Sequence, residues 1–441
     1  MFIPNTKEEQ AAMLAKIGAK DIHELLAQIP EKFLYPALDL PKALTEQELA
    51  AHVHELAAKN KPLKNFIGAG MYEHFIPAAV PALSSRGEFL TAYTPYQAEA
   101  SQGTLQTIYE FQSCMCALTG MDVATASHYD GATAMTEAAL AACRITGRSE
   151  IVISQLLHPH YKEVLKTYTR HANLTVTEAP ATQEGTLDLN ALKKTLTDKA
   201  ACFILQTPNF LGSLEDAQAV SAAVHGAGAL LVSVVNPISL GVVQTPGEYD
   251  ADFAVCEGQP LGNPVSFGGP GLGVMTAKKA YVRQLPGRIV GIAKDKDGKR
   301  AFVLTLQARE QHIRREKASS NICSNEALCA LNAVIYLTLL GPQGLKEVAE
   351  LNLERAHHLA DLINKTKKFH VKTLAPFFNE FVVQCPVAAA DVVAKLEEKG
   401  IAAGYDLGQL CPQMKNYLLV CATELRTEED LNAYADALGG I

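Results

Sequence analysis

Polar side chains gather in the turns that follow short apolar segments of the sequence. The segment Tyr129–Thr133 precedes a helical stretch, and later turns contain His158, Asn209 and Glu257. Ligands of open α/β sheets bind beyond the carboxyl ends of the strands, so these turns are the first candidates for a site. A helix that opens at Asp130 presents free backbone N–H groups, which suit a phosphate or another anion. Simple capping of that helix by Asp130 explains the same residues.

The sequence lacks the familiar signatures of nucleotide, nucleophile and metal sites. The run Gly268–Gly273 has neither the G-x-G-x-x-G spacing nor a following helix, so it indicates a close-packed turn. No Walker A or G-x-S-x-G sequence occurs. His158 and His160 flank a proline, and Cys114 and Cys116 would point to different faces of their helix. We therefore predict no metal site.

The placement of the basic residues is informative in this part of the chain. Between Lys199 and Lys278 there is neither Lys nor Arg, although the interval contains acidic residues such as Glu215 and Glu257. Burial of the strands alone would remove both kinds of charge. The interval covers three of the predicted strands and their turns, and it excludes a lysine that forms a Schiff base at this edge of the sheet.

Two further segments are dense in polar side chains. Tyr93–Gly103 lies just before a long predicted helix, and an N-terminal cap by Ser101 is the alternative explanation for its composition. Arg309–Lys317 contains several basic residues together with Glu310 and Glu316, which is more typical of a solvated helix face than of a site.

Alternating strands and helices would position these turns. Short apolar runs predict strands, and helical stretches lie between them. This order indicates βαβ units and a mostly parallel sheet, because buried parallel strands read as continuous hydrophobic runs. The predicted strands are Ile151–Ser154, Leu174–Glu178, Cys202–Gln206, Leu230–Val235, Phe253–Cys256 and Gly273–Thr276, and the predicted helices are Tyr161–Arg170, Leu189–Leu196 and Asp216–His225.

The regions on either side have a different character. Thr6 and Glu9 form a capping-box pattern within a mainly helical start, and an amphipathic helix is predicted for Ser101–Leu118. Two helical stretches, Asn325–Leu340 and Gly344–Ile363, then precede a small α+β region. We therefore divide the chain into a helical extension with interface loops (1–90), a large α/β domain (91–325) and a small C-terminal α+β domain (326–441).

Composition bounds the class of protein. The 441 residues are 48% hydrophobic and 20% charged, which excludes a disordered or fibrous chain. The net charge of −8 argues against a general nucleic-acid binder. Ten scattered cysteines are typical of reduced thiols rather than a disulfide framework. The most apolar stretch, Gly228–Val243, is too short to span a bilayer. Together these features predict a soluble, cytoplasmic protein with no membrane or nucleic-acid partner.

Several strings of residues together resemble one known family. They are YTPYQAE (93–99) with SQG (101–103), YDGAT (129–133), EGQPLG (257–262), SFGGP (266–270), and REQHIRR (309–315) through SNIC (320–323). On these strings the chain resembles, over essentially its whole length, the P-protein family of the glycine cleavage system (glycine dehydrogenase, decarboxylating). The resemblance is to the N-terminal type of subunit, subunit 1.

The resemblance implies a pyridoxal-phosphate (PLP) dependent transferase fold of type I and an enzyme divided between two subunits. In that arrangement the second subunit carries PLP on a lysine within an Asn-x-His-Lys type sequence. Here Gln259 and Pro260 stand at the histidine and lysine positions, and Ser233 replaces the acidic partner of the ring nitrogen. We therefore expect no PLP covalently bound to this chain. The expected vestigial pocket consists of Asp130, Gly131, Thr133, His158, Asn209, Ser233, Gln259 and Pro260.

The implied reaction is decarboxylation of glycine, with transfer of the aminomethyl group to the lipoyl arm of H-protein. Sites of this fold lie at subunit interfaces, so the chain is expected to complete the pocket of the second subunit and to hold no catalytic residue alone. The substrate-pocket candidates are Tyr93, Thr94, Tyr96, Gln97, Ser101 and Gln102. A non-catalytic scaffold or regulatory pseudo-enzyme is the alternative, whereas the lysine-free interval disfavours an autonomous PLP enzyme.

Overall fold

A computed structural model describes residues 5–441, which form two compact units that meet in sequence at Lys61 and Pro62. The first unit contains α1 (Lys7–Ile17), α2 (Ile22–Leu25) and α3 (Glu46–Ala57). The predicted capping box is present at α1, where Thr6 Oγ1 accepts from the Glu9 N–H and Glu9 Oε2 accepts from the Thr6 N–H. The predicted domain boundaries after residues 90 and 325 remain predictions.

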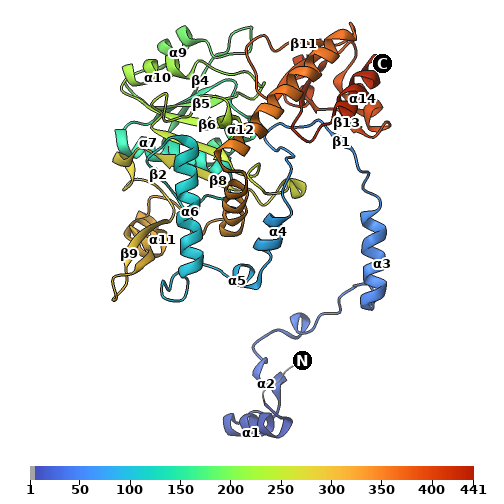
Figure 1. Cartoon of the computed structure of the whole chain (residues 1–441). Helices are drawn as coiled ribbons and strands as arrows, with labels where there is room; N and C mark the ends of the chain where they lie inside the picture. The colour runs from blue at the N-terminus through green and yellow to red at the C-terminus, as the bar shows by residue number, and fades with distance from the viewer. Residues whose placement is uncertain (1–4) are drawn as a thin grey trace. The chain divides into compact units, whose positions relative to one another are not determined.

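A seven-stranded sheet organises the second unit (Figure 1), in the order β2-β8-β7-β6-β5-β3-β4. The strands β3 to β7 are parallel to one another, and β8 runs antiparallel to both β7 and β2. The sheet is therefore mostly parallel, as predicted. Its strands are β2 (Val123–Ala124), β3 (Glu150–Ser154), β4 (Thr175–Ala179), β5 (Ala200–Thr207), β6 (Leu230–Val235), β7 (Phe253–Glu257) and β8 (Gly273–Ala277).

Helices cover both faces of this sheet. On β5, Cys202 and Ile204 pack in the cluster that includes α7, whereas Phe203 and Leu205 pack with α9 and α10 on the other face. Burial on both faces explains the continuous apolar runs of the sequence. The covering helices are α7 (Gly131–Thr146), α8 (Pro159–Thr169), α9 (Leu189–Thr195) and α10 (Ala217–Gly226).

Two long helices connect this sheet with the C-terminal region. The predicted helix before Gly120 is α6 (Gln102–Thr119), and Gly120 ends it in the left-handed conformation at φ 69°. The helix α12 (Ala327–Lys365) has two halves that meet at Gly341, where φ is 61° and ψ is −178°, so both predicted helices are present. Its length and composition would allow a membrane span, but it is broken before Pro342, and apolar side chains of both halves pack in the core clusters.

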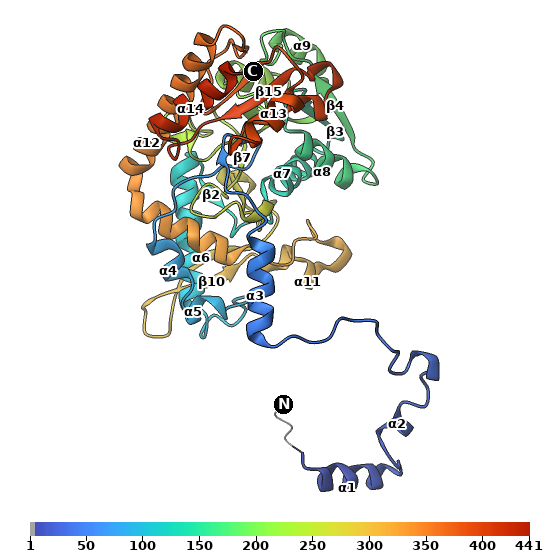
Figure 2. The same cartoon turned by 90° about the vertical axis from the view of Figure 1, so that its right-hand side faces the viewer.

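The C-terminal region is the predicted α+β arrangement (Figure 2). A four-stranded sheet in the order β11-β12-β15-β14 packs against α12, α13 and α14 around Phe381, Leu418 and Tyr434. Its elements are β11 (His370–Val371), β12 (Glu380–Gln384), α13 (Ala389–Glu397), β14 (Tyr405–Asp406), β15 (Tyr417–Cys421) and α14 (Glu428–Gly439).

Some elements were not predicted. The largest is the antiparallel hairpin of β9 (Ile289–Lys294) and β10 (Arg300–Thr305). Others are the short strands β2, β14 and β1 (Lys64–Asn65), the last of which pairs with β13 (Ile401–Ala402), and the short helices α4 (Ala79–Ser84) and α5 (Gly87–Leu90). The short helix α11 (Gln311–Arg314) lies within Arg309–Lys317, whose charges suggested a helix face.

Candidate functional site

The N-terminus of α7 lies at the carboxyl edge of the sheet. The sequence predicted either an anion site here or simple capping of the helix by Asp130. Asp130 and Thr133 form a capping box, with Asp130 Oδ1 accepting from the Thr133 N–H at 2.7 Å. Glu257, at the end of β7, adds a second acceptor, because its Oε2 lies 3.0 Å from the Gly131 nitrogen. The chain therefore supplies its own carboxylates at the place where a phosphate would bind.

Glu257 is bound by more than the helix. Its Oε1 accepts from the N–H groups of Gln259 at 2.9 Å and Leu272 at 2.8 Å. Burial raises the pKa of Glu257, while the three backbone bonds favour its ionised form. A Cβ at Gly131 would approach the Glu257 nitrogen to 2.7 Å, so only glycine permits this close packing.

The other residues of the expected vestigial pocket are also occupied by neighbouring groups of the chain. Ser233 is fully buried, and its Oγ lies 2.6 Å from the Tyr249 hydroxyl. Asn209 donates to Gly185 and Glu215 and accepts from two N–H groups of its own turn. These side chains hold the turns together, and none of them faces an open cofactor site.

A segment from outside the sheet crosses this edge, and we call Gly68–Phe75 the crossing segment. Gln259 fixes its middle, accepting from the Tyr72 N–H at 3.1 Å and donating to the Tyr72 carbonyl at 2.9 Å. His158 Nε2 lies 2.8 Å from the Ala69 carbonyl, and Glu380 Oε1 accepts from the Ala69 N–H at 2.6 Å. A residual cavity of about 40 Å³ lies between these residues, with room for only a few water molecules.

Two of the side chains that bond the crossing segment, His158 and Glu380, have strongly shifted pKa values. His158 Nδ1 accepts from the His160 N–H, so Nε2 carries the proton that is donated to Ala69. Burial lowers the pKa of His158 to about 4, which keeps the ring neutral. Burial raises the pKa of Glu380 to about 7, although both of its oxygens accept hydrogen bonds, from the Ala69 N–H and the Tyr72 hydroxyl.

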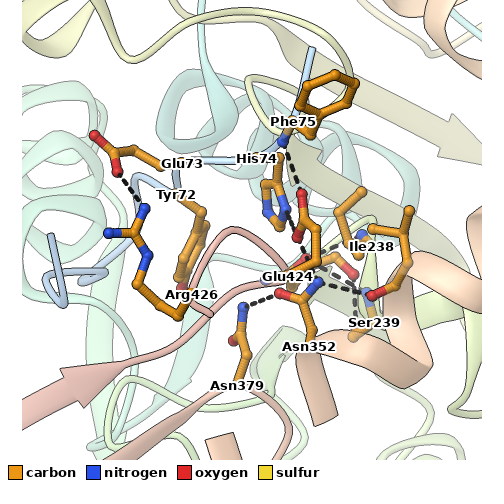
Figure 3. Close-up of polar contacts among 12 residues, drawn as sticks. Tyr72, Glu73, His74, Phe75, Ile238, Ser239, Asn352, Asn379, Glu424 and Arg426 are labelled. Atoms are coloured by element: carbon orange, nitrogen blue, oxygen red, sulfur yellow. Dashed lines mark hydrogen bonds and ion pairs between the residues drawn. The ribbon is translucent and has the colours of Figure 1, made fainter. Parts of the chain in front are cut away.

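The C-terminal half of the crossing segment is fixed by the C-terminal region (Figure 3). Glu424 accepts from the Phe75 N–H at 2.7 Å, and its Oε2 lies 2.9 Å from His74 Nδ1. Asn352 on α12 donates to the same Glu424 oxygen at 2.7 Å. The segment is thus bonded to both the large sheet and the C-terminal region. The glycines and prolines of this part of the sequence indicated an ordered loop, but no sequence signal identified Glu380 or Glu424 as its partners.

The PLP cofactor implied by the family resemblance does not fit these residues. Pro260 offers no amine, and the anion position at α7 holds Glu257. Ser233 is bonded to Tyr249 instead of presenting a carboxylate, and the crossing segment fills most of the remaining space. The side chains of this pocket are chemically unsuited to PLP, so no reaction step is assigned to it.

A second group of polar residues surrounds the N-terminus of α6, and we call it the tyrosine–arginine cluster (Tyr96, Arg288, Glu310, His312 and Ser324). Arg288 is only 2% exposed and donates to the Tyr96 hydroxyl at 3.2 Å and to Ser324 Oγ at 3.3 Å. Its Nε lies 3.6 Å from buried Glu310, and the Tyr96 and His312 rings are 5.9 Å apart. The cluster unites two of the family-like strings, YTPYQAE and REQHIRR, and the sequence gave no sign of Arg288.

The substrate-pocket candidates have different surroundings. Tyr93, Tyr96 and Gln97 are exposed. Ser101 stands at the N-cap position of α6, but its side chain makes no capping bond, so the capping explanation is wrong. The side-chain amide of Gln102 donates to the Phe302 carbonyl and accepts from the Phe302 N–H, and thereby fixes β10 to α6. Thr94 is partly buried, and its carbonyl accepts from the Tyr96 N–H at 2.9 Å.

Comparisons with known proteins agree over the whole chain. The family model described as glycine cleavage system P-protein matches residues 1–438. A probable glycine dehydrogenase (decarboxylating) subunit 1 from Moorella thermoacetica is 54% identical over 445 residues, covering 100% of this chain and 99% of that protein.

Solved structures agree with the family and the fold. The crystal structure of an inhibitor-bound glycine decarboxylase (P-protein) of the glycine cleavage system superposes with a TM-score of 0.92 at 44% identity, covering 100% of this chain and 99% of that chain. A C-DES mutant with glycine covalently linked to its PLP cofactor shares the fold at 16% identity, with a TM-score of 0.62 over 87% of this chain and 97% of that one. The predicted fold class, PLP-dependent type I, is thereby confirmed.

Removing the internal carboxylate should expose an anion site. In Glu257→Ala the N–H groups of Gly131, Gln259 and Leu272 lose their acceptor, so we expect a lower melting temperature and a rise in that temperature when inorganic phosphate is added. Differential scanning fluorimetry measures both. Glu215→Ala is the control, because this half-buried carboxylate accepts from the Leu187 N–H and not from a helix N-terminus. An equal response to phosphate in both variants would contradict the assignment.

The raised pKa of Glu380 predicts that the stability of the protein depends on pH. The folded state retains a proton that the unfolded chain releases between about pH 4.5 and 7, so this group lowers the free energy of unfolding as the pH rises through that range. In Glu380→Gln the contribution disappears. The stability of the variant relative to the wild type should therefore increase over this range by on the order of 3 kcal/mol. Urea unfolding at several pH values tests this, because the opposite contribution of His158 cancels in the difference. A constant difference would refute it.

Proposed function

Because the chain belongs to the P-protein family of the glycine cleavage system, we propose that it is the N-terminal subunit of a glycine decarboxylase and acts only with a second subunit. The observation that carries this proposal is the combination of a full-length match to subunit 1 proteins with a cofactor pocket filled by Glu257 and the crossing segment. A decarboxylase of this fold needs its cofactor, so the cofactor must be bound by another chain.

The proposed division of labour follows from what each chain can bind. The second subunit holds PLP, which when bound supplies an electron sink for the loss of carbon dioxide from glycine. The present chain forms the opposite wall of that site, where it orients glycine and the lipoyl group of H-protein. All ten cysteines of the chain are unpaired, which agrees with a cytoplasmic location.

The tyrosine–arginine cluster is the part of the chain that we assign to this wall. Tyr96 is 55% exposed, yet its hydroxyl is fixed from behind by buried Arg288. A half-exposed phenol with a fixed hydroxyl is preorganised to hydrogen-bond a small carboxylate or a sulfur atom. Tyr93, 79% exposed, extends the same aromatic surface.

A scaffold without any part in the reaction is the competing function. It predicts that side chains such as Tyr93 and Tyr96 affect assembly alone. The fixed geometry of the Tyr96 hydroxyl favours a part in turnover, because folding and assembly do not require an ordered phenol at an exposed position.

Chemical reduction locates the cofactor. When the assembled pair is treated with borohydride in the presence of PLP and the subunits are separated, mass spectrometry should find pyridoxyl-lysine on the second subunit and none on this chain. The isolated chain should also develop no visible absorption band with PLP. A reduced adduct on any lysine of the present chain would overturn the proposal.

Tyr96→Phe tests the role of the hydroxyl. We expect glycine–bicarbonate exchange by the reconstituted pair to fall by about 10- to 100-fold, which corresponds to the loss of one or two hydrogen bonds in the reacting complex. Gel filtration should show unchanged assembly. Tyr109→Phe is the matched control, because Tyr109 on α6 packs by its ring against Phe302 on β10. Full activity of Tyr96→Phe would favour the scaffold.

A further inference from the structure

The basic residues missing from one part of the chain are concentrated in the next. From Lys278 to Lys317 there are twelve Lys or Arg and four Asp or Glu, a net charge of +8. The whole chain carries −8, so the remaining residues carry −16. The positive segment covers the β9–β10 hairpin and the helical turns around α11, and both belong to the second unit.

Most of these cations are on the surface and lack anionic partners. We call the exposed members from Lys294 onward the basic face: Lys294, Lys296, Lys299, Arg300, Arg314, Arg315 and Lys317. None of them has an ion pair with the residues that the structure describes. Asp295 is used by the hairpin turn, where its Oδ1 accepts from the N–H groups of Asp297 and Lys299, and buried Glu310 pairs with Arg288. Unpaired like charges repel one another, which favours a negatively charged partner.

The basic face borders the tyrosine–arginine cluster. His312 on α11 contacts the Tyr96 ring, and Phe302 on β10 is bonded to Gln102 at the start of α6. Arg309, just before α11, donates to the Gly287 carbonyl directly before β9. Figure 1 accordingly places β9 and α11 next to each other beside α6. A partner bound to these cations is brought to the surface that carries Tyr96.

Two polar atoms inside the cluster also lack a hydrogen bond. Arg288 Nε and Glu310 Oε1 are buried and have no hydrogen-bond partner among the described residues. Exposed Ile292 and Ile313 place apolar side chains among the cations. Apolar residues surrounded by charge are typical of a protein interface, whereas the strongly acidic remainder of the chain would repel a nucleic acid.

We propose that the basic face is the docking surface for an acidic carrier protein that delivers the lipoyl group to Tyr96. The proposal rests on the function proposed above, in which such a carrier visits the site. A carrier that arrives and leaves in every cycle is suited by charge attraction, which accelerates association without requiring a large buried area. A permanent subunit contact would instead be expected to be extensive and apolar.

Charge reversal at the hairpin tip tests this surface. Lys296→Glu/Lys299→Glu changes two exposed side chains outside the tyrosine–arginine cluster, and Lys193→Glu/Lys194→Glu on α9 makes the same change far from β9 in Figure 1. Each variant is reconstituted with the second subunit, and glycine–bicarbonate exchange is measured with lipoylated carrier protein and with free lipoamide. For the hairpin variant we expect the KM for the carrier to rise by about tenfold or more at low salt, with kcat and lipoamide activity unchanged. The α9 variant should match the wild type.

Salt provides a second measurement. The wild-type KM for the carrier should rise with ionic strength, and that of the hairpin variant should rise less, because fewer attractive charges remain to be screened. An unchanged carrier KM overturns the docking surface. Loss of co-purification with the second subunit in the hairpin variant alone also overturns it and assigns the face to the subunit interface. If the wild-type pair shows no exchange with either acceptor, the proposed function itself has failed.

Discussion

The helix α7 begins at the edge of the sheet where cofactors of this fold bind, and its free N–H groups require acceptors there. In this chain Glu257 provides them, and the same carboxylate also accepts from the backbone of its own turn at Gln259 and from Leu272. One buried side chain thus joins the start of α7, the turn after β7 and the start of β8. The helix dipole and three hydrogen bonds stabilise its negative charge. Because that charge is supplied internally, the fold keeps its packing at this edge without any bound anion.

The crossing segment likewise joins separate parts of the second unit, namely the large sheet and the C-terminal region. It is bonded to His158 and Gln259 on the large sheet and to Glu380 and Glu424 in the C-terminal region. The bonds to His158, Gln259 and Glu380 are partly buried, and breaking one of them would leave a polar group without a partner. Separation of the two parts is therefore costly. The crossing segment therefore holds the large sheet and the C-terminal region in a fixed arrangement. Such rigidity suits a subunit whose outer surface supports a neighbouring site.

Much of the fold could be predicted from the sequence because its sheet is buried on both faces. Continuous apolar runs such as Leu230–Val235 identified the strands, and the break between the halves of α12 was visible at Gly341 and Pro342. The β9–β10 hairpin was missed because charged residues at its tip interrupt the pattern.

The resemblance to a family pointed to the YTPYQAE string, but the partners of its side chains could not be predicted from the sequence. Glu257 lies 126 residues from Gly131, and Arg288 lies 192 residues from Tyr96. Neither pair has a sequence spacing that predicts contact.

The interval without Lys or Arg now has a physical explanation that extends beyond the missing lysine. Most of its acidic residues serve as acceptors for backbone N–H groups: Glu215 for Leu187, Asp216 for Ala219, Glu248 for Thr245, Asp252 for Leu231 and Glu257 for Gly131. A lysine or arginine placed among them would compete for these carboxylates and weaken the turns that they hold. Cations are therefore tolerated only at the end of the interval, where Lys278 pairs with Asp250 and Asp252, and beyond it on the β9–β10 hairpin. The same separation of charge that stabilises the sheet edge leaves the basic face without an acidic partner among residues 5–441, and so available to an acidic protein.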